Sequence, residues 1–272
     1  TSAALAAYAA QAGMQAYVFL PAGKVASGKL AQAIGYGAKC LAIRGDFDDA
    51  MTLVQDAAED LGLYIVNSVN PFRLEGQKSI IWEILQDLSW QVPDWIVVPG
   101  GNLGNTSAFG KAIEEAYNWG WIDRKPKLAS IQAAGANPFY QAFQRQFDEL
   151  KPVSAETVAT AIRIGNPVNY NKAKRVITEL GGVVEEVTDE EILTAKKLID
   201  ETGIGCEPAS AASLAGTKKL VAAGTIPSTA HVVCIVTGHI LKDPEVIMKR
   251  DNLDQQMIET DADLKAVAKH IQ

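Results

Sequence analysis

The sequence predicts an α/β protein whose parallel strands are covered by helices on both faces. Short apolar runs alternate along the chain with segments whose apolar residues recur at helical spacing. The runs are apolar at nearly every position, which is typical of parallel strands buried on both sides. Parallel neighbours need a long crossover connection, and the intervening helical segments supply one. We therefore expect a doubly wound fold.

The first elements are marked by strong helix formers and by residues that end helices and strands. Residues 2–12 are rich in alanine, and Gly13 ends the helix that they predict. Pro21 closes the apolar run that follows. In this part of the chain, helices are predicted over 2–12, 28–36 and 48–62, and strands over 16–21, 38–44 and 63–67.

The remainder of the chain continues the same alternation. Residues 94–100 (DWIVVPG) are the clearest strand, because an unbroken apolar run leads straight into glycines. A polar tail is expected from about residue 250. Helices are predicted over 72–88, 106–119, 137–149, 170–180, 188–202 and 209–223, and strands over 94–100, 127–133, 182–187 and 231–236.

A polar, proline-terminated segment, NSVNP at 67–71, is the expected domain boundary. It separates a small αβ domain over 1–67 from a large αβ domain over 68–250, which is followed by a C-terminal tail over 251–272. The chain opens at Thr1 inside an alanine-rich helix, without an initiator methionine. The small domain is therefore interpreted as lacking its start, and a processed natural terminus is the alternative.

Composition and charge argue against several classes of partner. The chain has 272 residues, 25 Lys and Arg against 32 Asp and Glu, and a formal net charge of −7. An acidic protein has no long-range attraction for phosphate backbones or anionic lipids, so neither nucleic-acid nor membrane binding is expected. No apolar run reaches the roughly 18 residues of a membrane span. Cys40, Cys206 and Cys234 are widely separated, which predicts neither a disulfide framework nor a metal site and favours a cytoplasmic protein.

A glycine-rich loop, GGNLGN at 100–105, gives the sharpest functional signal. It joins the strand over 94–100 to a helix that opens with Thr106 and Ser107. Glycines permit a close approach of the backbone, so that successive N–H groups can converge on one anion, and the helix start adds the positive end of its dipole. The loop lacks the lysine of a nucleoside-triphosphate loop and does not fit the GxGxxG spacing. It indicates a phosphate site, and a glycine turn needed only for packing is the alternative.

A second signal is Thr237, in the segment HVVCIVTGHILKDP at 231–244. A hydroxyl at the end of a parallel strand lies at the same edge of the sheet as the glycine loop and can make one hydrogen bond there. Thr-Gly after a strand is also common in ordinary turns. His239 and Lys242 are more typical of solvated loop residues than of catalytic groups.

Two more segments place polar groups beside predicted helix starts. In YIVNSVNPFRLEGQK at 64–78, short polar side chains precede Arg73, and such a set can bind an anionic group. An ordinary capped helix with a surface arginine is the alternative. In GIGCEPASAASLAG at 203–216, Glu207 either faces the sheet edge or favours the positive end of a helix. Cys206 is expected to be a buried apolar residue.

Taken together, these segments resemble the threonine synthase family, whose members are pyridoxal-phosphate enzymes of the tryptophan synthase β-like fold (fold type II). The opening TSAALAAYAAQAG resembles the end of the family's SxGNTSAALAAYAA helix, and PGGNLGN resembles its loop for the cofactor phosphate. NSVNPFRLEGQK resembles the family's substrate-phosphate segment, and TGHILKDP its C-terminal motif. The resemblance covers residue 1 to about residue 250.

The resemblance implies an activity and a role for each matching position. The large domain would hold pyridoxal 5'-phosphate, with Thr237 hydrogen-bonded to the pyridine nitrogen. The implied reaction eliminates the γ-phosphate of O-phospho-L-homoserine and adds water at the β-carbon to give L-threonine, with Glu207 a candidate proton relay. The positions implied to hold the cofactor phosphate are Gly101, Asn102, Leu103, Gly104 and Asn105. Those implied to bind the substrate phosphate are Thr1, Asn67, Ser68, Arg73 and Asn102.

The sequence departs from the family at one catalytic position. Members carry the Schiff-base lysine upstream of the SxGN segment, and this sequence begins at the residue after the asparagine of that segment. No lysine of the chain lies in a matching context, and Lys24 and Lys29 are interpreted as part of a solvated helix start. The chain made as it stands is therefore expected to be an inactive fragment, and the activity is assigned to its parent.

Other classes of protein stay open at this point. A threonine or serine dehydratase-type β-eliminase would share the cofactor but would not need Arg73. A non-catalytic protein that binds a phosphate ligand would need no lysine. A nicotinamide-dependent dehydrogenase would place an acidic residue after the next strand, whereas Asp123 lies before it. Helices rich in small residues and the large apolar share leave room for a homodimer.

Overall fold

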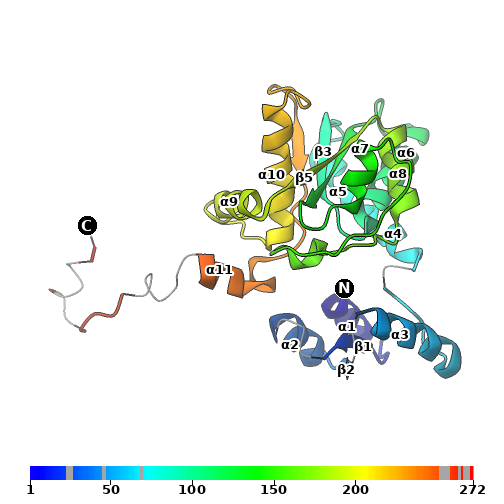
Figure 1. Ribbon diagram of the computed structural model, residues 1–272, viewed down its shortest axis with the longest axis vertical. Coiled ribbons are helices and arrows are strands. Elements are labelled where there is room, and N and C mark those ends of the chain that lie inside the picture. The colour runs from blue at the N-terminus through cyan, green and yellow to red at the C-terminus, as the bar shows by residue number, and fades with distance from the viewer. Residues whose placement is uncertain are drawn as a thin grey trace. The chain divides into compact units, whose positions relative to one another are not determined.

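A computed structural model describes residues 1–22, 27–44, 47–67, 70–250, 258–262, 265 and 270–271. Contacts between residues divide the chain into a first unit, Thr1–Lys242, and a second unit, Asp243–Gln272. Figure 1 shows the helices and strands of both. The expected boundary between a small and a large domain, at 67–71, includes residues 68–69, which lie outside the described residues, and it stays a prediction.

A two-stranded parallel sheet forms the first part of unit 1. Its strands are β1 (Tyr17–Pro21) and β2 (Lys39–Ile43), and their register pairs Phe19 with Leu41. Alanines dominate the small core around it, because helices with short side chains can approach the sheet closely. The helices of this part are α1 (Ser2–Gln11), α2 (Ser27–Gly35) and α3 (Phe47–Leu61).

A four-stranded parallel sheet forms the larger part of unit 1. Its strand order is β5-β4-β3-β6, with β3 between β4 and β6. The register pairs Val97 of β3 with Ala129 of β4 and with Cys234 of β6. The strands are β3 (Trp95–Pro99), β4 (Lys127–Ala133), β5 (Val183–Val187) and β6 (Val232–Cys234).

Helices cover both faces of this sheet, as the unbroken apolar strands predict (Figure 1). Alternate residues of β3 belong to different cores: Ile96 and Val98 face one layer, and Trp95 and Val97 face the other. One layer contains α5 (Ser79–Asp87), α6 (Gly104–Asn118), α7 (Pro138–Gln144) and α8 (Tyr170–Glu179), and the other contains α9 (Asp189–Asp200) and α10 (Pro208–Ala222). The doubly wound α/β fold class is confirmed.

The structure corrects two of the predicted elements. Residues 63–67 are not a strand: they hydrogen-bond to no neighbouring strand in the described chain, and Tyr64 is 70% exposed. The predicted helix over 72–88 is divided at Lys78 into α4 (Phe72–Gln77) and α5. Lys78 itself keeps a helical φ of −57° and ψ of −33°, and its ammonium group pairs with Glu75 and Glu115.

Smaller differences occur at the ends of elements. The helix predicted over 137–149 ends at Gln144, because Phe147 takes a positive φ of 59° that turns its ring into the core beside Phe139. Short 3-10 helices that the sequence does not predict are η1 (Thr160–Ile162) and η2 (Ile240–Lys242).

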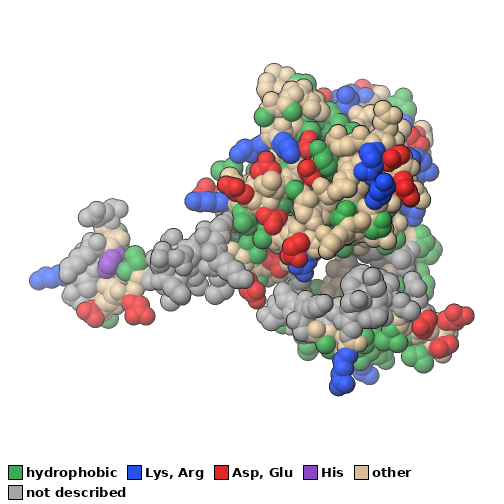
Figure 2. Space-filling model, in the orientation of Figure 1, with side chains coloured by type: hydrophobic (Ala, Val, Ile, Leu, Met, Phe, Trp, Pro, Cys, Tyr) green, Lys and Arg blue, Asp and Glu red, His purple; other side chains and the backbone are tan. Residues whose placement is uncertain are grey.

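The second unit begins with α11 (Pro244–Arg250), where the sequence predicts no helix. Much of the expected tail over 251–272 lies outside the described residues. In the described part of the whole chain, no helix has both the length and the apolar character needed to cross a membrane. On the face shown in Figure 2, acidic and basic side chains are interspersed over the part that contains the four-stranded sheet.

Candidate functional site

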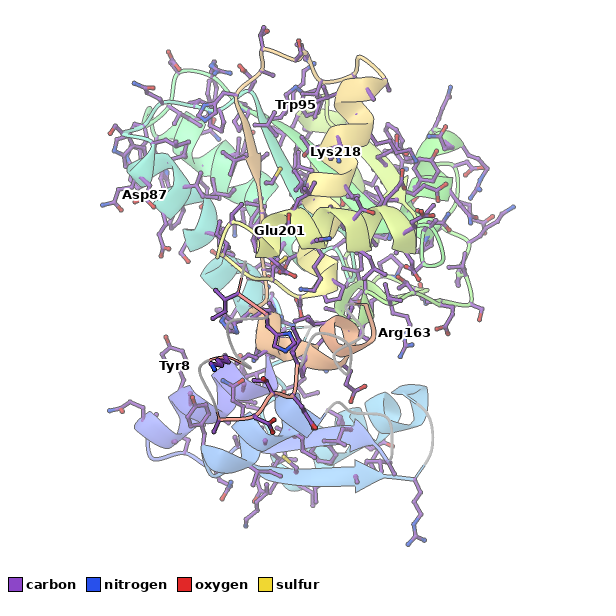
Figure 3. All side chains as sticks on the ribbon, turned by 90° about the vertical axis from the view of Figure 1, so that its left-hand side faces the viewer. Tyr8, Asp87, Trp95, Arg163, Glu201 and Lys218 are labelled. Carbon is purple, nitrogen blue, oxygen red and sulfur yellow. The ribbon has the colours of Figure 1, made fainter. Side chains whose placement is uncertain are left out.

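The candidate site lies at the carboxyl edge of the four-stranded sheet. Val97 of β3 pairs with Cys234 of β6. Gly100 lies three residues after Val97, and Thr237 lies three residues after Cys234, so both lie at the same edge of the sheet. The helix α6 follows β3 and α10 precedes β6, so both helices begin at this edge, where their dipoles are positive. Figure 3 labels Trp95, at the start of β3, and Arg163, just after η1. The two residues lie toward opposite ends of the part of unit 1 that contains the four-stranded sheet.

The glycine loop is closely packed at two positions. A Cβ atom on Gly100 would lie 2.7 Å from Ser130 Oγ, and one on Gly101 would lie 3.1 Å from the carbonyl oxygen of Ala161. Leu103 has a φ of 62°, in the left-handed region, and is the N-cap residue of α6. The first amides of a helix have no acceptor within the helix, so the loop presents N–H donors at the sheet edge.

Neighbouring segments hold the loop in place from two sides. Asn169 donates its backbone N–H and its side-chain amide to the carbonyl oxygen of Asn102, both at 3.2 Å. Gln132, fully buried, donates to the carbonyl oxygen of Gly100 at 3.2 Å and accepts from the N–H groups of Phe139 and Tyr140. Sequence reasoning missed both residues, because Asn169 reads as an ordinary helix start and Gln132 as one polar residue in an apolar strand.

The first turn of α6 is fixed by its own hydroxyl groups. Ser107 Oγ donates to the carbonyl oxygen of Leu103 at 2.8 Å, and Thr106 shares a hydrogen bond of 3.1 Å with Ser130. Gly104 and Asn105, the first two residues of the helix, are half-buried. These two hydroxyl groups therefore fix the start of α6 and the end of the glycine loop.

Thr237 lies in a compact group of polar side chains. Its hydroxyl is 2.8 Å from Ser210 Oγ and donates to Glu207 Oε1 at 3.3 Å. Glu207 is only 7% exposed, and its backbone N–H donates to the carbonyl oxygen of Gly238. A Cβ atom on Gly238 would lie 2.3 Å from the Glu207 carboxyl carbon, so this position requires glycine.

A buried ion pair fixes the segment that carries Glu207. Lys196, fully buried, donates to Asp200 at 2.7 Å and to the carbonyl oxygen of Cys206 at 2.6 Å. Asp200 accepts in turn from the backbone N–H of Cys206 at 3.1 Å. The expectation that Cys206 is buried is confirmed, and burial raises the pKa of its thiol to about 11. This thiol therefore stays protonated at neutral pH and is not a nucleophile.

All of the expected substrate-binding residues except Asn102, which lies in the glycine loop, are on α4 or precede it in the chain. Arg73 Nη2 donates to Thr1 Oγ1 at 3.2 Å, which joins residues 72 positions apart. Burial lowers the pKa of the half-buried Arg73. Asn67, also half-buried, accepts at its carbonyl oxygen from the N–H of Asn70. Ser68 lies outside the described residues.

The helix α4 is packed against the start of α6. A Cβ atom on Gly104 would lie 3.4 Å from Gln77 Oε1 and 3.9 Å from a methyl group of Leu74. Arg73 is the neighbour of Leu74 in the same short helix. The structure therefore places the helix that carries Arg73 beside the end of the glycine loop.

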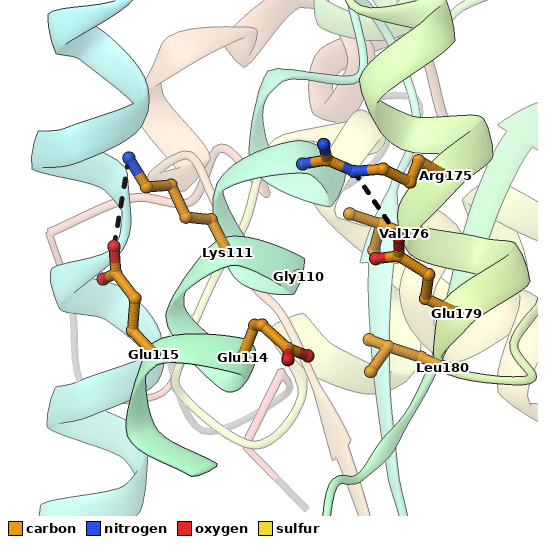
Figure 4. A pocket seen from close by; sticks show the side chains of 8 residues that line it. All are labelled: Gly110, Lys111, Glu114, Glu115, Arg175, Val176, Glu179 and Leu180. Atoms are coloured by element: carbon orange, nitrogen blue, oxygen red, sulfur yellow. Dashed lines mark ion pairs between the residues drawn. The ribbon is translucent and has the colours of Figure 1, made fainter. Parts of the chain in front are cut away.

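The side chains of His239 and Lys242 hydrogen-bond to groups other than Thr237 and Glu207. His239 is exposed, and its Nδ1 accepts from the backbone N–H of Leu241 at 3.2 Å. Lys242 donates to Gln32 at 2.6 Å. A surface hollow of about 170 Å³ between α6 and α8 is lined mainly by charged side chains, with an ion pair between Arg175 and Glu179 (Figure 4). It lies along the sides of these helices, away from the strand ends.

Comparison with known proteins identifies the family. The profile described as "Pyridoxal-phosphate dependent enzyme" matches residues 1–238. Threonine synthase from Methanosarcina acetivorans is 50% identical over 273 residues, covering 100% of this chain and 67% of its own length. Threonine synthase from Methanocaldococcus jannaschii is 52% identical over 92% of this chain and 62% of its own length. The chain belongs to the threonine synthase family of pyridoxal-phosphate dependent enzymes. It spans about two thirds of the length of these curated relatives.

Solved structures confirm the tryptophan synthase β-like fold of the family. Maize serine racemase matches with a TM-score of 0.74 at 19% identity, covering 94% of this chain and 76% of the other. A processed threonine deaminase isoform from Solanum lycopersicum matches with a TM-score of 0.76 at 19% identity, covering 93% and 67%. At this identity the likeness concerns the fold alone.

The described residues fit the cofactor of the threonine synthase family. The loop has close-packed glycines at 100 and 101 and leads into the start of α6, whose first N–H groups have no acceptor within the helix and suit a phosphate group. The exposed hydroxyl of Thr237 on the neighbouring strand suits a single ring nitrogen. The site therefore offers a separate set of donors for each polar end of pyridoxal phosphate.

Proposed function

We propose that the protein eliminates the γ-phosphate of O-phospho-L-homoserine and adds water at the β-carbon to give L-threonine. The observation that carries this proposal is the packing of α4, with Arg73, against the start of α6, with the glycine loop. Two phosphate-binding segments side by side fit a reaction in which cofactor and substrate each carry a phosphate. The identity of about 50% to threonine synthases supports the same activity.

The residues of the loop have the simplest role. Backbone amides of Gly101, Asn102, Leu103, Gly104 and Asn105 hold the cofactor phosphate, and Thr237 hydrogen-bonds the ring nitrogen. Pyridoxal phosphate, when bound, takes up the negative charge that develops on the substrate carbon. Because the loop is anchored by Asn169 and Gln132 before any ligand arrives, little ordering is needed on binding.

The second set of residues binds the substrate. Arg73, with Thr1, Asn67, Ser68 and Asn102 around it, holds the phosphate of O-phosphohomoserine. A guanidinium group gives two parallel hydrogen bonds to a phosphate and stays charged at all working pH values. Half-burial of Arg73 strengthens such a contact, because water screens it less. Glu207, whose neighbour Cys206 is held by Lys196 and Asp200, is proposed to move a proton.

Substitution of Arg73 tests the substrate. In the catalytically active protein, Arg73→Ala is expected to raise KM for O-phosphohomoserine by about tenfold or more, because a charge-assisted hydrogen bond contributes about 1.5–3 kcal/mol. The matched control is Arg175→Ala, an exposed arginine on α8 that pairs only at 3.8 Å with Glu179. Steady-state phosphate release measures both variants. An unchanged KM in Arg73→Ala would favour the dehydratase-type β-eliminase instead.

Covalent binding of the cofactor gives a second test. We propose that the 272-residue chain made on its own does not turn over O-phosphohomoserine, because no lysine in it matches the context of the Schiff-base lysine. Lys78, Lys196 and Lys219 are engaged in ion pairs, whereas Lys24 and the side chain of Lys29 lie outside the described residues. Incubation with pyridoxal phosphate, reduction with borohydride and peptide mass spectrometry should find labelling of surface lysines only. A single lysine labelled stoichiometrically and needed for turnover would contradict this proposal.

Two further properties concern the location and the assembly of the protein. We propose that the protein acts in the cytoplasm, as its net charge of −7 and its scattered cysteines favour. We also propose a homodimer, because helices rich in small residues can pack closely against a second copy. Sedimentation velocity of the purified chain would settle the second property.

A further inference from the structure

We propose that Ser210 is a positioning residue, which fixes the Thr237 hydroxyl as a hydrogen-bond donor that points out of the sheet edge toward the ring nitrogen of the cofactor. The inference rests on the cofactor site proposed above. Ser210 is completely buried in the first turn of α10, three residues after Glu207, and therefore does not touch a ligand itself.

The hydrogen bonds around Ser210 determine the direction of its own proton. Its Oγ lies 2.8 Å from the backbone N of Thr237 and 2.9 Å from that of Gly238. Backbone N–H groups can only donate, and a serine oxygen has two lone pairs, so both are occupied. The third neighbour of this oxygen is Thr237 Oγ1 at 2.8 Å. Ser210 must therefore donate its proton to Thr237.

This assignment determines what the Thr237 hydroxyl does. One lone pair of Thr237 Oγ1 receives the Ser210 proton, so the Thr237 proton has to be donated elsewhere. Glu207 Oε1 is 3.3 Å away, longer than the 2.7–2.8 Å that is usual between two oxygens. Thr237 is exposed at the sheet edge, whereas Ser210 is not. A ring nitrogen without a proton can thus replace this weak bond with a shorter one.

Ser213 offers a matched control on the same helix. It is also completely buried, and its hydroxyl is 2.8 Å from the carbonyl oxygen of Ser210 and 3.0 Å from that of Ile235. It joins α10 to the end of β6 but has no hydrogen bond with Thr237. Replacing either serine by alanine removes one buried hydroxyl. Only Ser210→Ala removes hydrogen bonds to Thr237 and Gly238.

The first measurement needs no ligand. Amide hydrogen exchange is followed by NMR in the full chain and in its Ser210→Ala and Ser213→Ala variants. Loss of the shared acceptor in Ser210→Ala should speed exchange of the Thr237 and Gly238 amides by about tenfold relative to the rest of β6 and α10. Ser213→Ala should leave these two amides as protected as in the original chain. Unchanged protection in Ser210→Ala would overturn the assignment of the acceptor.

The second measurement uses two probes, pyridoxal phosphate and its analogue with C–H in place of the ring nitrogen. The full chain should bind pyridoxal phosphate about five- to tenfold more tightly than the analogue, and the ¹⁵N resonance of the labelled ring should be that of an unprotonated nitrogen. The preference should fall in Ser210→Ala, vanish in Thr237→Val and persist in Thr237→Ser and Ser213→Ala.

The outcomes separate this inference from the proposed function. An undiminished preference in Ser210→Ala, or a protonated nitrogen in the full chain, would overturn the role of Ser210 while leaving the cofactor site intact. Failure of the full chain to bind either probe would overturn the proposed cofactor site and the outward role of Thr237 together. The exchange measurement would still decide whether Ser210 holds the turn.

Discussion

At the scale of single residues, glycine positions decide the shape of the candidate site. Gly100 meets Ser130 Oγ and the side chain of Gln132, and Gly238 meets the Glu207 carboxyl group. In both places another part of the site occupies the space that a Cβ atom would need. Close packing therefore disfavours a side chain at positions 100 and 238, independently of any ligand.

Substituting Gly100 tests this requirement. A methyl group at 2.7 Å from Ser130 Oγ and 3.3 Å from Gln132 Cγ should cost about 1–3 kcal/mol in the free energy of unfolding, as overpacking usually does. The control is Gly76→Ala in α4, where no atom lies within 4 Å and alanine should stabilise the helix by about 0.5–1 kcal/mol. Urea denaturation measures both variants. Equal urea midpoints for the two variants would show that the loop accommodates the added methyl group without loss of stability.

At the scale of elements, Lys78 connects the helices that carry the two proposed phosphate-binding segments. It lies where α4 meets α5, and its ammonium group pairs at 2.6 Å with Glu75 of α4 and with Glu115 of α6. Burial acts to lower the pKa of Lys78, but the hydrogen bonds to these two carboxylates outweigh it and the pKa is raised. Its ammonium group also lies 5.0 Å from the centre of the Trp82 ring.

Removing the charge of Lys78 should weaken the packing of α4 against α6. Lys78→Met is expected to lower the free energy of unfolding by about 1–3 kcal/mol near neutral pH, because two carboxylates lose a buried partner. A group with a raised pKa stabilises fully below its unfolded pKa, here 10.5, and the stabilisation is lost as the pH rises through the folded value. The difference in the free energy of unfolding between the original chain and Lys78→Met should therefore become smaller above about pH 10.5.

The matched variant is Lys111→Met, since Lys111 also pairs with Glu75 and Glu115 but is 44% exposed. It should cost less than about 1 kcal/mol, as exposed pairs do. Thermal unfolding followed by circular dichroism at several pH values compares the two. Equal losses of unfolding free energy in Lys78→Met and Lys111→Met would contradict the role of Lys78. A loss in Lys78→Met that does not depend on pH would contradict it as well.

At the scale of the whole molecule, the division into two units predicts what can be removed. The family profile ends at residue 238, inside unit 1, which ends at Lys242. A chain that stops at Lys242 should unfold cooperatively, with a free energy within about 1 kcal/mol of the full chain. A chain that stops at Ala222 lacks β6 and Thr237 and should lose that cooperative transition, because β3 would then be an uncovered edge. Urea titration with circular dichroism distinguishes the two.

The sequence by itself determined the fold class, nearly all of the strands, and the motifs at the sheet edge. These features depend on local signals: unbroken apolar runs, glycines between a strand and a helix, and prolines at helix starts. It failed at 63–67, which belong to neither sheet of the described residues, and it did not predict the break between α4 and α5 at Lys78.

Only the tertiary structure decided how the site is held together. Gln132, Asn169, Lys196 and Ser210 are isolated polar residues in the sequence, and nothing local distinguishes them from surface residues. Their roles come from partners 10 to 67 positions away, at hydrogen-bond distance in a buried setting. A buried polar group needs a hydrogen-bond partner, but the sequence does not show which residue provides it.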